Sequence, residues 1–153
     1  MHGDDEERCD PMYGDSAASR KRVAQLREQG GDIRAAADRL VAQAESVPWH
    51  GRAAEAMRTR IKERANHLRV AAGHHETAAD SLARHLTEVD ARKEAIEATR
   101  HRAESLMTDA ASRIAALEAH GEAHPADEDA VLAAFTPPPA GHKDWLSVEL
   151  PGL

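Results

Sequence analysis

The sequence predicts an all-α protein, an antiparallel helical hairpin whose second helix is much longer than the first. Apolar residues recur at alternating steps of three and four through two long runs, which is the spacing of a heptad seam. Alanine dominates the apolar residues and aromatic residues make up only 3% of the chain. This composition suits closely packed helices rather than a sheet sandwich. Proline and glycine separate the two runs at residues 47–51, which we call the corner.

Residues 1–15 form an acidic leader that we expect to be disordered, because it has no apolar periodicity. It is unlike a basic secretory or transit peptide, and no stretch of the chain approaches the length of a transmembrane helix. Cys9 is the only cysteine, so neither an internal disulfide nor a cysteine-based zinc site can form. The formal net charge of −7 disfavours nucleic acid as the main partner, because phosphate binding needs a basic face.

The first helix is expected to begin at Ser16 or Ser19, since either can act as the N-cap, and to run up to the corner. The Gly30-Gly31 pair weakens this helix by about 1 kcal/mol per glycine relative to alanine. We expect the pair to permit close approach of another backbone, because the seam keeps its phase on both sides. That seam comprises Val23, Leu26, Gly30, Ile33, Ala37, Leu40, Ala44 and Val47.

The second seam follows Gly51 and continues to about residue 120, so the helical domain spans residues 16–120. A first helix of about 30 residues is roughly 45 Å long, whereas the second would reach about 100 Å if it is continuous. The distal half of the second helix would then carry an apolar stripe that the first helix does not cover. Either a partner covers this stripe or the chain folds back on itself.

Two places could allow the fold-back. One is residues 73–75, and the other is residues 87–90, where Thr87 and Asp90 resemble a capping box. A break at Thr87 would produce a three-helix bundle, which is the alternative architecture. Against a break, no glycine or proline lies between residues 74 and 120 and the seam keeps its phase, which favours a continuous or merely bent helix.

The corner contains a turn motif of Pro48, Trp49 and Gly51. Proline ends the first helix, because it lacks an N–H and disfavours helical geometry in the residue before it. Gly51 tolerates a positive φ and can serve as the N-cap of the second helix. Trp49 supplies a large, rigid side chain that can cover the open end of an alanine-rich helix pair.

Trp49, His50 and Gly51 stand as W-x-G between two heptad-patterned helices. In this arrangement, residues 16–86 resemble the WxG family of helical-hairpin proteins handled by type VII secretion systems of actinobacteria and their relatives. The resemblance implies that two hairpins pack as a four-helix bundle in a homo- or heterodimer. In that family a Y-x-x-x-[DE] export signal commonly follows the second helix. Here the only tyrosine is Tyr13, and Ala17 stands four residues after it, so the resemblance implies a signal-less member that is co-exported with its partner or shields it.

No pattern of catalytic or cofactor-binding residues stands out, so we expect neither an enzyme nor a bound cofactor. The chain has ten histidines, but their spacings do not favour a metal site. His74 and His75 point about 100° apart on a helix, so they cannot easily share one ion. His120 and His124 are four residues apart, but Gly121 and Pro125 disfavour the regular helical turn that would bring them together. His75 falls on the apolar seam, where we expect a buried neutral side chain that can act as a pH-sensitive element.

Residues 121–153 are expected to contain a short helix at 126–135, a stiff spacer at Pro137–Pro139 and a hydrophobic tail. Trp145 would be out of place in a disordered tail. We therefore predict that the segment around it docks in extended form on the helices or on a partner. The predicted docking residues are Trp145, Leu146, Val148 and Leu150.

The preferred functional hypothesis is a non-enzymatic WxG-like protein of type VII secretion, which pairs through its helices with a co-encoded protein. It would stay in the cytoplasm until export. A cytoplasmic coiled-coil adaptor or scaffold, and a chaperone or immunity partner of a secreted toxin, are the alternatives. The predicted partner interface comprises Met57, Ile61, Leu68, Leu82, Leu86, Val89 and Ile96.

Overall fold

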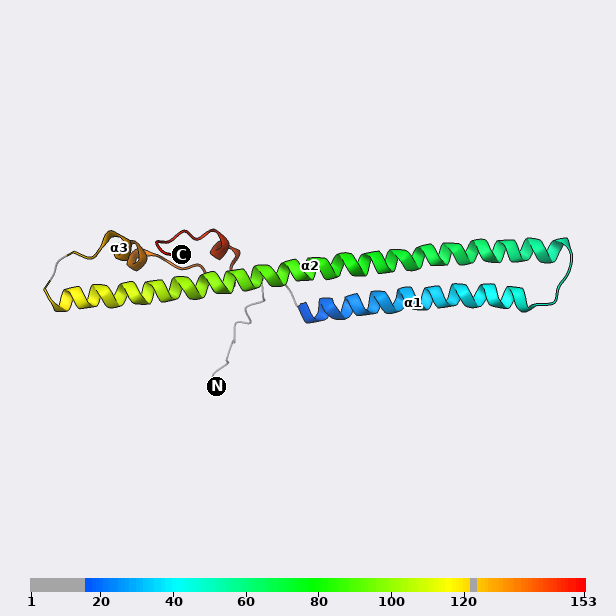
Figure 1. The fold of residues 1–153 in the computed structure, drawn as a ribbon, viewed down its shortest axis with the longest axis horizontal. Coiled ribbons are helices and arrows are strands. Elements are labelled where there is room, and N and C mark those ends of the chain that lie inside the picture. Colours follow the sequence, from blue (N-terminus) through cyan, green and yellow to red (C-terminus); the bar gives the residue numbers. More distant parts are fainter. Residues whose placement is uncertain (1–15, 122–123) are drawn as a thin grey trace, which may run out of the picture. The chain divides into compact units, whose positions relative to one another are not determined.

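The structure is a computed structural model that describes residues 16–121 and 124–153, and these residues form helices and connecting segments without a strand. The all-α prediction is confirmed. The predicted disorder of residues 1–15, together with Cys9 and Tyr13, lies outside the described residues. The elements are α1 (Ser16–Ser46), α2 (Arg52–Ala119), α3 (Asp127–Ala134) and the 3₁₀ helix η1 (Lys143–Ser147) (Figure 1). The chain forms two compact units, which divide within α2 between Glu88 and Val89.

In the first unit, α1 packs antiparallel against the part of α2 that follows the corner (Figure 1). Four exposed ion pairs show the direction, because the residue number on α2 falls as the number on α1 rises. Exposed pairs of this kind each contribute about 0–1 kcal/mol, so they set the register of the two helices more than they stabilise them. The pairs are Arg27–Asp80 (3.1 Å), Arg34–Glu76 (2.8 Å), Asp38–Arg69 (2.7 Å) and Glu45–Lys62 (3.1 Å).

Small residues bring the two helices close together. Gly30 is buried, and a Cβ atom added there would lie 3.2 Å from the carbonyl oxygen of Ala72, whereas one added at Gly31 would meet nothing within 4 Å. The predicted close approach is therefore confirmed for Gly30 alone. Alanines on α2 fill the seam, and larger side chains gather toward the start of α1, where Val23 packs with Leu86.

Helix α2 runs without a break through both places considered for a fold-back. The hydroxyl of Thr87 donates to the carbonyl oxygen of Ala83 (3.1 Å). This is the back-bond of a threonine inside a helix rather than the contact of an N-cap residue. A three-helix bundle with a break at Thr87 is therefore not what the chain forms.

In the second unit, the chain's own C-terminal segment covers the distal part of α2. After Pro125, α3 and the residues up to Leu153 return along this helix (Figure 1). Ile96 and Ala103 form a buried cluster with Trp145, and four partly buried side chains pack against it: Phe135, Val148, Leu150 and Leu153. Of the two possible covers for this apolar stripe, a partner or the chain itself, the structure shows the chain's own C-terminal segment over Ile96 and Ala103.

Candidate functional site

The corner is built from backbone contacts that the turn motif makes possible. Helix α1 ends at Ser46, and the N–H of Trp49 donates to the carbonyl oxygen of Val47 (2.8 Å) across Pro48, which closes a tight three-residue turn. Gly51 has a φ of 99°, a value that side-chain-bearing residues rarely adopt. Its carbonyl oxygen accepts from the N–H of Glu55 (3.1 Å), so Gly51 stands at the N-cap of α2.

Arg58 ties the corner together, although it is not among the residues predicted to form the turn motif. Its guanidinium donates to the carbonyl oxygens of Ala44 (3.3 Å), Val47 (3.0 Å) and Trp49 (2.8 Å). The last carbonyls of a helix lack intrahelical donors, and a cation is favourable beside them because of the helix dipole. An arginine about two turns into the helix after a short corner is the signal that could have identified this contact.

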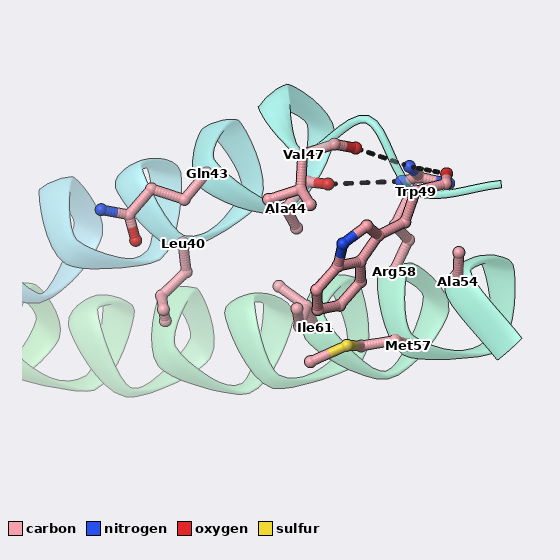
Figure 2. A pocket seen from close by; sticks show the side chains of 9 residues that line it. All are labelled: Leu40, Gln43, Ala44, Val47, Trp49, Ala54, Met57, Arg58 and Ile61. Atoms are coloured by element: carbon pink, nitrogen blue, oxygen red, sulfur yellow. Dashed lines mark hydrogen bonds between the residues drawn. The ribbon is translucent and has the colours of Figure 1, made fainter.

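Trp49 does not close the end of the helix pair, because its exposed fraction is 56%. It forms one wall of a pocket of about 200 Å³, which Figure 2 shows together with the nine residues that line it. Leu40 and Met57 also line this pocket and are 40% and 47% exposed. Large apolar side chains that remain accessible around a hollow are typical of binding surfaces rather than of finished cores.

The predicted interface residues divide between this surface and the interior. Met57 is exposed at the pocket, whereas Ile61, Leu68 and Leu82 are half-buried. Leu86 and Val89 are buried. Ile96 is 1% exposed and packs against Trp145, so it is not available to a partner, because the C-terminal segment already covers it.

The predicted docking segment lies against α2, but it is not extended as expected. Trp145 sits in η1, is 1% exposed, and donates from Nε1 to the carbonyl oxygen of Pro139 (3.0 Å). Val148 and Leu150 pack against the same cluster, whereas Leu146 is 50% exposed and does not contribute. The 3₁₀ turn orients Trp145 toward α2 and Leu146 toward solvent.

Two arginines of α2 hold the returning chain. Arg113 forms a two-point ion pair with Asp129 of α3, with Nε 3.0 Å from Oδ2. The guanidinium of Arg102 donates to the carbonyl oxygen of Gly152 (2.7 Å). The hydrogen bonds from Arg113 lower the pKa of Asp129 below its ordinary value. A carboxylate that is nearly buried, as this one is, needs such a partner.

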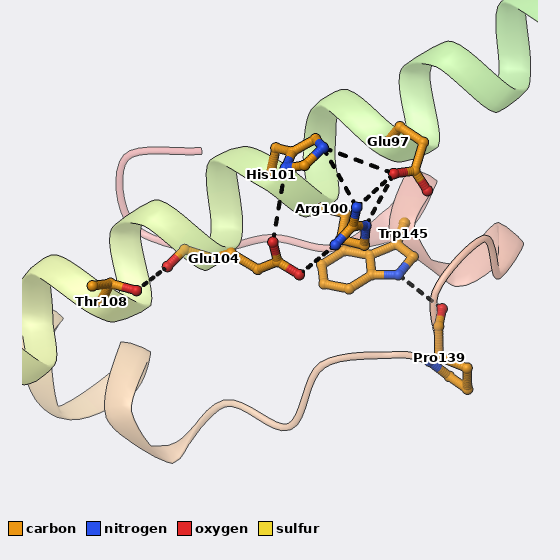
Figure 3. A network of polar contacts seen from close by, with 7 residues as sticks. All are labelled: Glu97, Arg100, His101, Glu104, Thr108, Pro139 and Trp145. Carbon is orange, nitrogen blue, oxygen red and sulfur yellow. Dashed lines mark hydrogen bonds and ion pairs between the residues drawn. The ribbon is translucent and has the colours of Figure 1, made fainter.

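A surface network lies beside Trp145, as Figure 3 shows. Arg100 donates to Glu97 (2.7 Å) and to Glu104 (2.6 Å), one turn before and after it on α2. These hydrogen bonds raise the pKa of Arg100 and lower the pKa of Glu97. Arg100 interrupts the apolar seam in the sequence, and the network shows that its charge is balanced within the same helix.

Within residues 16–121 and 124–153, no group of three or more histidine, cysteine or acidic side chains is arranged to hold a metal ion. In the same part of the chain, no helix is both long and apolar enough to cross a membrane. His75 is half-buried on the seam, and its Nδ1 is buried without a hydrogen-bond partner among the described residues.

A comparison of the chain with family models, with curated proteins and with solved structures finds no match to any of them.

Proposed function

We propose that this protein acts without catalysis, by pairing its helices with those of a protein partner. The observation that carries the proposal is the accessible apolar surface at the corner, where Leu40, Trp49 and Met57 surround a pocket. Val70, Val131 and Leu146 are also exposed, but at the corner three large apolar side chains are exposed together around one pocket. Their exposure at the corner is explained if a second protein covers them.

We further propose that the pairing is of the WxG kind and serves type VII secretion. The support is the W-x-G sequence at residues 49–51, set in a corner between two antiparallel helices. On this proposal the helical hairpin of residues 16–88 docks beside a partner hairpin in a four-helix bundle. Met57, Ile61 and Leu68 would contribute the accessible part of the contact, and the complex would be exported as a unit.

The test is co-expression with the product of the neighbouring open reading frame, followed by measurement of the mass of the purified complex. Met57→Lys places a charge in the contact and should abolish the complex. Val70→Lys is the matched control, because Val70 is also exposed on α2 (60%) and lines no pocket described here. Equal effects of the two substitutions would refute the corner as the binding surface.

A second readout separates secretion from a cytoplasmic scaffold. The complex should appear in the medium of cells that have the ATPase of the type VII secretion system. It should be absent from the medium of cells that lack this ATPase. Trp49→Ala with Gly51→Ala should remove the protein from the medium. A complex that forms but always stays inside the cell would support the coiled-coil adaptor, and one that neutralises a co-encoded toxin would support an immunity role.

A further inference from the structure

We propose that the surface at the corner binds an acidic amphipathic helix. This inference rests on the proposed function, in that it takes the corner as the partner-binding surface, and it adds the chemistry of the partner. The pocket shown in Figure 2 adjoins a second hollow of about 700 Å³, and both are lined by Leu40, Met57 and Ile61. The two hollows therefore form one continuous surface, which we call the corner groove.

The walls of the corner groove carry positive charge and no negative charge. Arg60 and Arg64 line the second hollow, Arg58 lines the first, and no aspartate or glutamate among the described residues lines either. This local excess of arginine stands out in a chain whose formal net charge is −7. A partner that buries the groove must therefore bring the opposite charge to its edge.

Two of these arginines are not neutralised within the chain. Arg58 is occupied by the carbonyl oxygens of the corner. In contrast, Arg60 and Arg64 are exposed, and neither has a hydrogen bond or an ion pair with any described residue. Nearby Lys62 is paired with Glu45 across the helices. The charge available to a partner is therefore that of Arg60 and Arg64.

The spacing of these features fits a helix. Arg60 and Arg64 are four residues apart on α2, so their side chains project from one face about one turn apart. Carboxylates four residues apart on a partner helix have the same spacing. An apolar stripe on that helix would enter the groove between Leu40 and Met57, which is the way amphipathic helices dock in hydrophobic grooves.

A second copy of this chain fits less well. A symmetric contact of the groove with itself would place the same arginines opposite each other, and like charges across an interface oppose association. An anionic membrane offers the right charge, but its headgroups have no fixed spacing that matches two arginines one turn apart on a helix. The observations favour an acidic helix, and the test below separates it from an anionic membrane.

The experiment measures binding of fluorescein-labelled synthetic peptides to the full chain by anisotropy. The probe is an 18-residue peptide with leucines at positions i, i+3, i+4 and i+7 and glutamates on the flanks of that stripe. A second peptide replaces every glutamate with lysine, and a third keeps the glutamates but replaces the leucines with glutamine. Only the first should bind, and raising NaCl from 50 to 300 mM should weaken its binding because exposed charges are screened.

Variants of the full chain locate the contact. Arg60→Glu with Arg64→Glu should weaken binding of the acidic peptide by about 5- to 30-fold, from the strength expected of two partly exposed charge pairs. Arg84→Glu with Arg92→Glu is the matched control, because it changes the net charge equally at two other exposed arginines of α2. Met57→Lys should abolish binding, since it blocks the apolar part of the groove.

Several results would overturn the inference. The lysine peptide could bind as tightly as the acidic peptide or more tightly, or the peptide without leucines could bind as tightly as the acidic peptide. The charge reversal at Arg84 and Arg92 could also weaken binding as much as the reversal at Arg60 and Arg64. Binding to phosphatidylglycerol vesicles without binding to the acidic peptide would assign the surface to a membrane. If the co-expressed partner binds and Met57→Lys releases it while Arg60→Glu with Arg64→Glu does not, the acidic helix is refuted and the proposed function stands. If neither peptide nor partner binds, the proposed function itself fails.

Discussion

Replacing Trp145 with alanine removes one of the two largest fully buried side chains described in the protein. In the native structure its ring packs against Ile96 and Ala103 and meets the ring of Phe135 edge-on, with centroids 6.4 Å apart. Its Nε1 also donates to the carbonyl oxygen of Pro139. All three contributions disappear together in Trp145→Ala.

The size of the effect follows from this burial. Truncating a buried tryptophan to alanine typically costs about 3–5 kcal/mol. The Ile96 cluster shares no residue with the cluster of Val23, Ala79 and Leu86 in the first unit. We therefore expect the loss to fall on the C-terminal segment, while the pairing of α1 with α2 keeps its stability.

Hydrogen exchange resolves the two regions. In Trp145→Ala, the protection of amides in residues 127–150 should fall by roughly 100- to 4,000-fold, since every 1.4 kcal/mol is a factor of ten. Amides of α1 should exchange as in the wild type. Leu146→Ala is the control, because this neighbouring side chain is 50% exposed and should change protection by less than about threefold.

Retention of protection in Trp145→Ala would refute the claim that this side chain anchors the segment. An equal loss of protection in α1 would refute the independence of the two clusters.

Three further predictions concern single contacts. Arg58→Ala leaves the carbonyl oxygens of the corner without their charged donor and should lower the free energy of unfolding by about 1–3 kcal/mol; Arg58→Lys should recover only part of it, and equal stability of all three proteins in urea would contradict this role. Gly31→Ala should stabilise α1 by up to about 1 kcal/mol, whereas Gly30→Ala should gain less or lose stability, because its Cβ would press on the opposite backbone; equal melting temperatures would contradict the close approach. Because Arg113 lowers the pKa of Asp129, the stabilisation it gives is complete above the unfolded pKa of about 3.9 and is lost as the pH falls through the lower folded value. Exchange protection in α3, corrected for intrinsic rates, should therefore weaken only below about pH 4 in the wild type and show no such step in Asp129→Asn, and a loss near pH 6 would exclude this carboxylate as the cause.

The heptad pattern carried the prediction of helices, because spacing alone decides which residues share a face of a helix. It also favoured a continuous α2 over a break at Thr87. The threonine resembled a capping residue in sequence, but a hydroxyl can instead bond to the carbonyl oxygen four residues earlier. Only the structure shows that it does so.

Contacts between distant parts of the chain could not be predicted in the same way. The sequence shows that Trp145 needs burial, but the residues around it in the sequence do not indicate that it packs against Ile96. From the sequence, Ile96 is therefore predicted to contact a partner, which the structure shows to be wrong. For Arg58 the sequence offers only a position, about two turns into the helix after a short corner, and its hydrogen bonds depend on where the last carbonyl oxygens of α1 point.

Ile96 can be buried only after the C-terminal segment that covers it has been synthesised. The ribosome synthesises this part of α2 before Trp145, so the nascent chain exposes the apolar stripe around Ile96 until the segment that contains Trp145 has emerged. Incomplete chains that end before the Pro137–Pro139 spacer would keep that stripe bare. Such truncated products should aggregate during synthesis, whereas the full-length protein should not.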